Sequence, residues 1–204
     1  MDGLLEVADD SLARFFRAWY GEPDRAAIIV SNPQLPPALR TWYSLAARYL
    51  TPVTSHHVVL GADQVTTSDG MAVFWLENQG VYEWAFEADG VDPLVFERAT
   101  VDGEPWHPTG VHLKAFLISV AVLEAIMGAE HGLYRNSLSA TIHAALLAPL
   151  RPLPMPGPTV GAQLYAGDGL LAFSGPVDVD ASAASGWLYL ASLTDDGLRY
   201  ARDI

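Results

Sequence analysis

Cysteine is absent from the 204-residue sequence. A disulfide framework, a thiolate metal site and a cysteine nucleophile are therefore excluded. The absence also suits a reducing compartment, so we expect a cytoplasmic protein. Basic residues are scarce, with 11 lysines and arginines against 24 acidic residues and a formal net charge of −13. Nucleic-acid affinity depends on basic side chains that release counterions, so this charge disfavours DNA or RNA and favours a basic protein as the partner.

Long apolar runs are also missing. The most apolar segment is AFLISVAVL, residues 115–123, and a membrane-spanning helix needs about 20 such residues. The N-terminal MDGLLEVADD lacks the basic and then apolar pattern of a signal peptide. We therefore expect no membrane association. Half of the residues are hydrophobic, which is enough to build a sizeable core in one domain.

The sequence contains partial matches to cofactor-binding and metal-binding motifs, but each lacks a neighbouring element or ligand that the motif requires. GDGLLA, residues 167–172, matches a dinucleotide fingerprint, but the residues after it have a strand pattern and not the required helix. Asp178 and Asp180 have the spacing of calcium ligands without the glycine and glutamate of the loop, so we expect a surface loop. His56-His57 and the pair His107 and His112 have no third ligand at a fitting spacing. We expect no enzyme activity, no cofactor and no metal.

Several segments have helical spacing of their apolar residues. These are residues 12–20 with Ser11 as N-cap, a helix that starts at Pro36-Pro37 and ends before Pro52, and a long buried helix over 111–132. Thr109 is the expected cap of the long helix and Gly132 its expected end. Residues 138–150 are expected to be helical or irregular, and a short helix near the C-terminus is expected with Thr194 as N-cap.

Strand patterns occur in two places. MAVFWL (71–76), VYEWAFE (81–87) and LVFER (94–98) are separated by short polar connections, which predicts an antiparallel meander. Near the C-terminus we expect a hairpin turning at Gly167-Asp168-Gly169, a strand over 186–192 and an extended Pro-rich segment over 151–158. The prediction is one α+β domain, residues 1–204, with a central antiparallel sheet of about six strands flanked by helices. Whether the C-terminal strands within 159–204 join that sheet stays open.

The polar cluster Glu77-Asn78-Gln79-Gly80 lies between the first two strands of the meander. Gly80 suits the left-handed backbone of a short hairpin loop, and Asn78 tolerates it. Glu77 and Gln79 can hydrogen-bond the turn or a neighbouring element. The favoured interpretation is structural, and direct contact with a partner is the alternative.

The order of these features resembles the SUKH superfamily, which includes the fungal cell-wall-assembly regulator and many bacterial immunity proteins. The likeness covers residues 35–127: a helix with Trp42, a strand ending in Glu77-Asn78-Gln79, a strand with Trp84, then DPLVF, Trp106 and HLKAFLISVAVLEAI. The resemblance implies a single α+β domain without enzyme activity. It also implies that a cognate toxin, often one that degrades nucleic acid, is bound and neutralised.

The acidic residues of this stretch would face such a basic toxin domain. Eight acids and one base, Arg98, lie between positions 77 and 104. The alternative for each acid is a solvated surface position. Two other functions stay open: a non-inhibitory regulatory module of the same superfamily, and a hydrolase that uses a carboxylate pair. The candidate partner-binding residues are Glu77, Asn78, Gln79, Glu83, Glu87, Asp89 and Asp92, with Trp42, Gly80 and Trp84 as structural residues.

Overall fold

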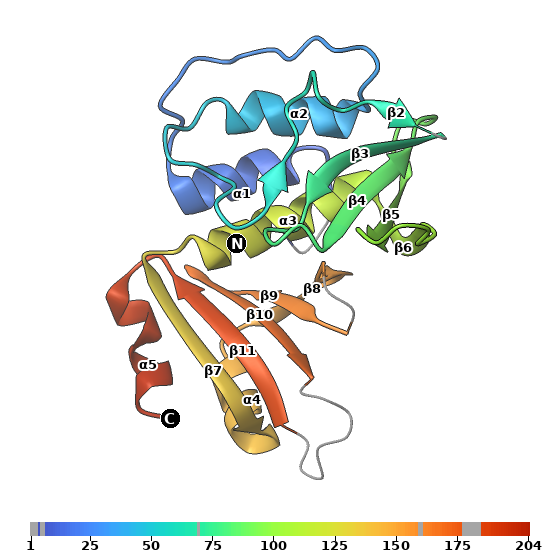
Figure 1. Cartoon of the computed structure of the whole chain (residues 1–204). Coiled ribbons are helices and arrows are strands. Elements are labelled where there is room, and N and C mark those ends of the chain that lie inside the picture. Colours follow the sequence, from blue (N-terminus) through green and yellow to red (C-terminus); the bar gives the residue numbers. More distant parts are fainter. Residues whose placement is uncertain (1–3, 5–6, 69, 159–160, 177–184) are drawn as a thin grey trace. The chain divides into compact units, whose positions relative to one another are not determined.

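The computed structural model describes residues 4, 7–68, 70–158, 161–176 and 185–204 (Figure 1). The chain divides into two compact units, Glu22–Ile118 and Met1–Gly21 with Ser119–Ile204. We call them the six-stranded unit and the five-stranded unit after their sheets. Both contain helices and antiparallel strands, so the predicted α+β class is confirmed. The C-terminal strands do not extend the first sheet but form a second one.

The sheet of the six-stranded unit contains the predicted meander. Its path is β1-β3-β4-β5-β6, with β2 paired to β3, and every pairing is antiparallel. Strand β6 was not predicted, because its sequence HPTGVH has no alternating apolar pattern and includes proline and glycine. The strands are β1 (Val58–Val59), β2 (Thr67–Ser68), β3 (Met71–Leu76), β4 (Tyr82–Glu87), β5 (Leu94–Ala99) and β6 (His107–His112).

A bulge in β3 shapes the aromatic core of this unit. The pairing with β4 shifts between Val73 and Trp75, so Phe74 is the extra residue. Both Phe74 and Trp75 are fully buried. The Phe74 ring lies 5.5 Å from that of Phe86, and the Trp75 ring meets Trp42 edge-on at 5.3 Å. The bulge therefore lets two consecutive large side chains enter one core, which strict alternation would prevent.

Two helices complete the six-stranded unit. Helix α2 (Pro37–Ala46) has proline in its first turn, as predicted, and buries Leu39 and Trp42. Helix α3 (Leu113–Met127) begins later than predicted, and its residues up to Ile118 belong to this unit. Thr109 does not cap it, since Thr109 lies in β6 and donates to the carbonyl of Val95.

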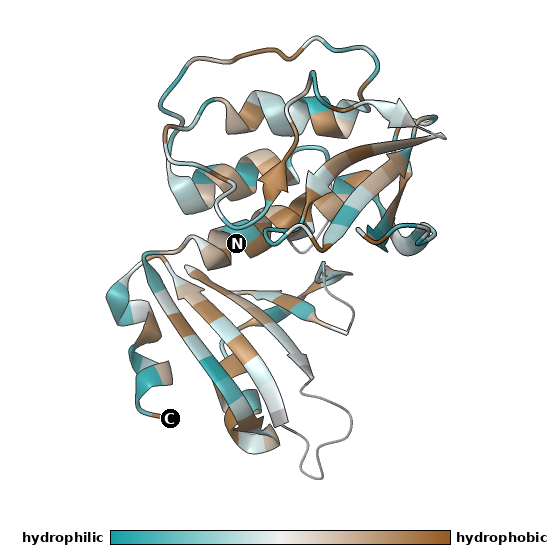
Figure 2. Ribbon diagram, viewed as in Figure 1, coloured by the Kyte–Doolittle hydropathy of each residue, from teal (hydrophilic) through white to brown (hydrophobic). Residues whose placement is uncertain are grey.

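The cap of α3 comes from a distant residue. The carboxylate of Asp92 accepts a 2.8 Å hydrogen bond from the backbone N–H of Lys114, in the first turn of the helix. A carboxylate at a helix N-terminus also interacts favourably with the helix dipole. Most residues of α3 are buried, and Figure 2 shows hydrophobic residues along its length. Within the described residues, no helix has both the length and the apolar character that membrane crossing requires.

The five-stranded unit has the strand order β7-β11-β10-β9-β8, also antiparallel throughout. The predicted hairpin is β9 and β10, with Gly169 in a left-handed conformation at φ +64°, and the predicted strand over 186–192 is β11. The elements are α1 (Ser11–Tyr20), β7 (His131–Ser139), α4 (Ala140–Leu147), β8 (Arg151–Pro156), β9 (Gln163–Ala166), β10 (Leu170–Pro176), β11 (Ser185–Ser192), the 3₁₀ helix η2 (Asp195–Leu198) and α5 (Arg199–Arg202).

Of three element ends predicted in this unit, two are wrong and one is confirmed. Ser11 is the first residue of α1 and not its N-cap; its buried hydroxyl accepts from the N–H of Ala8. Gly132 does not end α3, because it lies in β7. Thr194 is the predicted N-cap, and its hydroxyl accepts from the N–H of Gly197.

The Pro-rich segment is extended as predicted and forms the edge strand β8, a position where missing N–H groups are tolerated.

The core between this sheet and its helices consists mainly of leucine. Leu188 and Leu190 alternate along β11, and Leu146 of α4 and Leu198 of η2 belong to the same buried cluster. The hydroxyl of Tyr200 donates to the carbonyl of Leu146 at 2.9 Å, which joins α5 to α4. Alternation places Leu188 and Leu190 on one face of β11, and the sheet shifts register between Gly186 and Leu188, where β11 pairs with β7, and between Pro152 and Pro156, where β8 pairs with β9.

Candidate functional site

The Glu77-Asn78-Gln79-Gly80 cluster forms the turn between β3 and β4. Gly80 has φ +70°, and its N–H donates to the carbonyl of Glu77 at 2.9 Å. The carboxylate of Glu77 accepts from the N–H of Gln79 at 2.7 Å and from that of Val81 at 3.4 Å. Glu77 therefore uses its charge inside the turn. This is the structural role that the sequence favoured, and it makes Glu77 a poor candidate for partner contact.

The end of β5 holds the same turn from the other side. Thr100 donates from its N–H to the carbonyl of Val81 at 3.0 Å and from its hydroxyl to the carbonyl of Gly80. Around this fixed backbone, three apolar side chains are exposed: Val81 at 50%, Tyr82 at 47% and Val101 at 67%. The side chains of Asn78 and Gln79 are exposed beside them. We call Asn78, Gln79, Val81, Tyr82 and Val101 the hairpin-end surface.

Glu83 is occupied in the middle of the sheet. Its carboxylate receives a 2.6 Å hydrogen bond from Nε of Arg98, on the neighbouring strand β5, and the Glu83 side chain is only 14% exposed. The guanidinium of Arg98 also lies 4.2 Å from the ring centre of Trp106. This arrangement neutralises Glu83 and the only base of the acidic stretch together, so neither charge is free for a partner.

The remaining candidate acids lie at the other end of β4. Asp92 caps α3. Glu87 and Asp89 are exposed, and neither has an ion pair or hydrogen bond to its side chain among the described residues. The seven predicted partner-binding residues therefore do not form one site. Asn78 and Gln79 belong to one end of the strand pair, Glu87 and Asp89 to the other, and Glu77, Glu83 and Asp92 serve the fold.

The structural tryptophans are both in the core. Trp42 is fully buried, and Trp84 is 5% exposed. Trp84 Nε1 donates to the carboxylate of Glu97 at 3.2 Å, so a further acid of the stretch has an internal partner. The Trp84 ring also lies 6.0 Å from that of Phe116 in α3. These contacts link the strand of the resemblance motif to the helix that comes after it.

A pocket of about 520 Å³ opens in the six-stranded unit, and no sequence pattern indicated it. Its lining combines apolar and polar side chains. Asn32 connects two of its walls: its Nδ2 donates to the carbonyl of Ala62, and its Oδ1 accepts from the N–H of Gln34, each at 3.0 Å. The lining comes from the segment before α2, the turn before β2, and the adjoining parts of β3 and β4, and comprises Asn32, Gln34, Leu35, Asp63, Val65, Thr66, Thr67, Ala72, Phe86 and Ala88.

The histidine pairs have local partners. The rings of His56 and His57 are 4.6 Å apart and nearly perpendicular, although adjacent histidines on extended chain point apart. Asn78 Nδ2 lies 3.5 Å from His56 Nδ1. His107 lies 3.4 Å from Glu104, and His112 lies 2.7 Å from the carbonyl of Asp92. No group of three potential metal ligands occurs among the described residues.

A serine and a histidine meet in the five-stranded unit, far apart in the sequence. His143 Nε2 of α4 lies 2.5 Å from Oγ of the buried Ser174 in β10. The Ser174 hydroxyl also lies 2.9 Å from the carbonyl of Trp187 in β11. The pair therefore joins α4 to the sheet.

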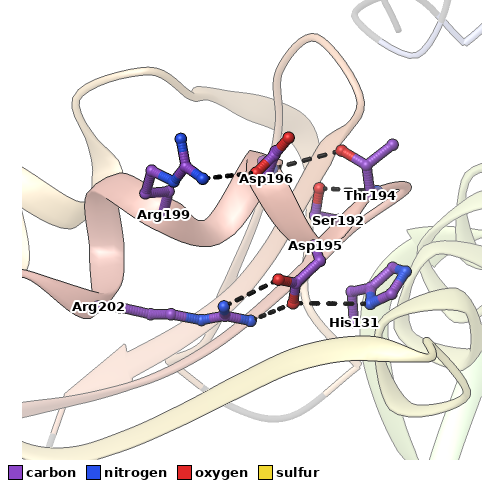
Figure 3. Close-up of polar contacts among 8 residues, drawn as sticks. His131, Ser192, Thr194, Asp195, Asp196, Arg199 and Arg202 are labelled. Atoms are coloured by element: carbon purple, nitrogen blue, oxygen red, sulfur yellow. Dashed lines mark hydrogen bonds and ion pairs between the residues drawn. The ribbon is translucent and has the colours of Figure 1, made fainter.

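The C-terminal turn carries a group of exposed charges (Figure 3). Asp195 lies between Arg202, which donates to both of its carboxylate oxygens, and His131, whose Nδ1 is 4.0 Å away. The hydrogen bond from Arg202 holds the pKa of Asp195 below its ordinary value. Arg199 pairs with Asp196 at 3.2 Å. The two arginine pairs link η2 to α5, and their opposite charges compensate each other. Asp178 and Asp180 lie outside the described residues.

Comparisons with known proteins leave the family undetermined. No family model matches this chain, and no significant match was found among curated proteins or solved structures. The resemblance to the SUKH superfamily stays a prediction. The geometry defines an α+β protein with two antiparallel sheets, an exposed hairpin-end surface and a mixed apolar and polar pocket.

Proposed function

We propose that this protein is a non-enzymatic, immunity-type inhibitor that binds a basic toxin domain and blocks it by occlusion. The observation that carries the proposal is the hairpin-end surface. Protein interfaces combine apolar and aromatic side chains at their centre with a polar rim. Tyr82 supplies an exposed aromatic side chain, Val81 and Val101 are exposed apolar residues at the same end of the hairpin, and Asn78 and Gln79 add amide groups.

The rigidity of the turn supports the same function. Binding costs less conformational entropy when the contact residues are already held in place. Here the carboxylate of Glu77, the glycine conformation at Gly80 and both hydrogen bonds from Thr100 fix the backbone below the exposed side chains. The acids predicted to contact the partner thus contribute in a different way: Glu77 positions the neighbours that make contact.

Charge supports a basic partner. The chain carries a net charge of −13, and Glu87 and Asp89 are exposed at the far end of β4. Long-range attraction of this kind raises the association rate more than it raises the affinity. We therefore expect a 1:1 complex whose association rate falls as salt rises, while its dissociation rate changes less.

The test uses the toxin domain encoded beside this protein, purified and mixed with it at several salt concentrations. Tyr82→Ala should weaken the complex at least about 30-fold if Tyr82 is a central anchor, since such residues contribute about 2 kcal/mol or more. The matched control is Tyr134→Ala, in β7, because Tyr134 is exposed to a similar degree, 48% against 47%. It should leave the affinity within about twofold.

Two results would contradict the proposal. Absence of binding to the neighbouring toxin would remove the inhibitor function altogether. Equal effects of the two tyrosine variants, with both folded by circular dichroism, would remove the hairpin-end surface as the contact. If binding occurs but salt leaves the association rate unchanged, the electrostatic contribution is wrong while occlusion stands. A neighbouring gene that encodes no toxin would favour the regulatory module.

A further inference from the structure

The pocket of the six-stranded unit has a lining suited to one chemical class of occupant. Leu35, Ala72 and Phe86 belong to the lining but are each at most 3% exposed, so the apolar surface of the pocket comes mainly from Val65 and Ala88. Asp63 is the only charged residue in the lining, and no lysine or arginine contributes to it. The rim adds hydroxyl groups and an amide, which accept hydrogen bonds. A side chain with an apolar stem and a cationic end would match both the apolar part of the lining and the acidic, polar part.

Asp63 lies in a turn that Gly61 and Gln64 close. The carbonyl of Gly61 accepts from the N–H of Gln64 at 2.8 Å, and Gln64 Oε1 accepts from the N–H of Gly61 at 2.8 Å. A Cβ atom at Gly61 would lie 2.8 Å from Oδ1 of Asp63, so the carboxylate packs directly against the glycine backbone. The negative charge of Asp63 also acts on Tyr43, whose pKa is raised first by burial and then by Asp63. Asp63 itself is exposed where it lines the pocket.

We propose that this pocket binds an arginine side chain presented by a protein partner. The three methylene groups would lie against Val65 and Ala88, and the guanidinium would meet Asp63 and the rim. Arginine suits this site better than lysine, because its planar group carries five donors in fixed directions for the several acceptors around it. Only the identity of the partner rests on the proposed function; the preference for a cation does not.

The test is a titration of the full-length ¹⁵N-labelled protein with N-acetyl-arginine N-methylamide, followed by NMR. Backbone signals of residues 62–67, Ala72 and Ala88 should shift with saturable, millimolar affinity. The citrulline analogue has the same shape without the charge and should bind about two- to fivefold more weakly, since the exposed ion pair with Asp63 would be lost. The lysine analogue should fall between the two.

Two variants locate the effect. Asp63→Asn should weaken arginine binding about two- to fivefold, as expected for a partly exposed ion pair. Gly61→Ala keeps every charge but displaces the carboxylate, and it should weaken binding as well. The matched control is Asp168→Asn, at an exposed position in the β9–β10 turn, which changes the net charge equally. Its effect should be within experimental error.

The proposal is overturned if the arginine and citrulline analogues bind equally, or if Asp63→Asn and Asp168→Asn have the same effect. Failure of the proposed function gives a different pattern. In that case the arginine analogue still binds at the pocket, but the neighbouring toxin does not bind the protein. If the toxin binds and the arginine analogue does not, the pocket proposal alone is wrong.

Discussion

In each unit helices pack against an antiparallel sheet, but the core around β3 consists of aromatic rings, whereas the buried cluster around β11 consists mainly of leucines. In the first, Phe74 and Trp75 enter the core side by side because β3 is bulged. In the second, Leu188 and Leu190 alternate along β11 in the ordinary way. Both cores lie beside a register shift, between Val73 and Trp75 in the β3–β4 pairing and between Gly186 and Leu188 in the β11–β7 pairing. In the aromatic core the shift lets two consecutive large side chains be buried.

The two units also use their carboxylates differently. In the six-stranded unit, Glu77, Glu83 and Asp92 are each built into a turn, a strand pair or a helix start. In the five-stranded unit, Asp195 and Asp196 form exposed pairs with arginines near the C-terminus. Acidic residues can therefore hold the fold together in one unit and form exposed surface pairs in the other. Only the partners of each carboxylate distinguish the two roles.

The largest expected effect is on the aromatic core. Phe74→Ala should lower the free energy of unfolding of the six-stranded unit by about 3–5 kcal/mol, because it removes a fully buried ring at a bulge that cannot close over the cavity. Urea unfolding followed by amide hydrogen exchange would measure the loss and locate it. A loss below about 1 kcal/mol would show that the bulge can repack, and the contrast between the cores would weaken.

Leu188→Ala is the corresponding change in the leucine core. Leu188 is fully buried, so we expect a loss of about 2–5 kcal/mol, with faster exchange in β7, β10 and β11. The same urea and exchange measurements apply. Exchange that accelerates equally in β3 and β4 would contradict the prediction, because it would mean that the two units unfold as one.

Gly80→Ala tests the hairpin turn. A β-carbon at φ +70° should cost about 1–3 kcal/mol through backbone strain, although no atom lies within 4 Å of that position. The control is Gly132→Ala in β7, which lacks a positive φ and has its nearest neighbour at 3.7 Å. Thermal unfolding of both variants gives the comparison. If Gly132→Ala lowers the stability as much as Gly80→Ala does, backbone strain is excluded as the cause.

The smallest expected effect is the alkaline loss of stability, and it involves both units. Burial raises the pKa of Tyr43 in the six-stranded unit, and of Tyr20, Tyr165 and Tyr200 in the five-stranded unit, above the ordinary value of 10.0. A raised pKa in the folded state means that the neutral form is favoured, so its contribution is complete below pH 10 and is lost as the pH rises further. The unfolding midpoint should therefore be constant from pH 8 to about 9 and fall above 10.

Single variants would sharpen that result. Tyr43→Phe should reduce the alkaline loss more than Tyr165→Phe, because the charge of Asp63 adds to the effect of burial at Tyr43. Differential scanning calorimetry at pH 8 and pH 10.5 would measure both. An unfolding midpoint that does not fall above pH 10 would show that these tyrosines ionise without penalty in the folded protein.

Much of the fold followed from local patterns. The meander β3–β4–β5, the hairpin β9–β10 and the Thr194 cap were predicted correctly, because turn residues and alternating apolar positions act over a few residues. The turn at Gly80 was recognised for the same reason. Strand β6 and the start of α3 were not, since HPTGVH becomes a strand only by pairing with β5, and the cap of α3 comes from Asp92. The division into two sheets could not be predicted, because pairing partners are distant in sequence.

By itself, the sequence determined the acidic charge, the absence of cysteine chemistry, the α+β class and the polar turn, all of which depend on composition or on neighbours along the chain. Tertiary structure alone decided which acids are already occupied: Glu83 by Arg98, Asp92 by an α3 amide. It also decided that Asn32, Asp63 and Phe86 line one pocket. Net charge and the spacing of apolar residues can be read along the chain. The partner of a carboxylate and the lining of a pocket depend on contacts between distant segments, which only folding brings together.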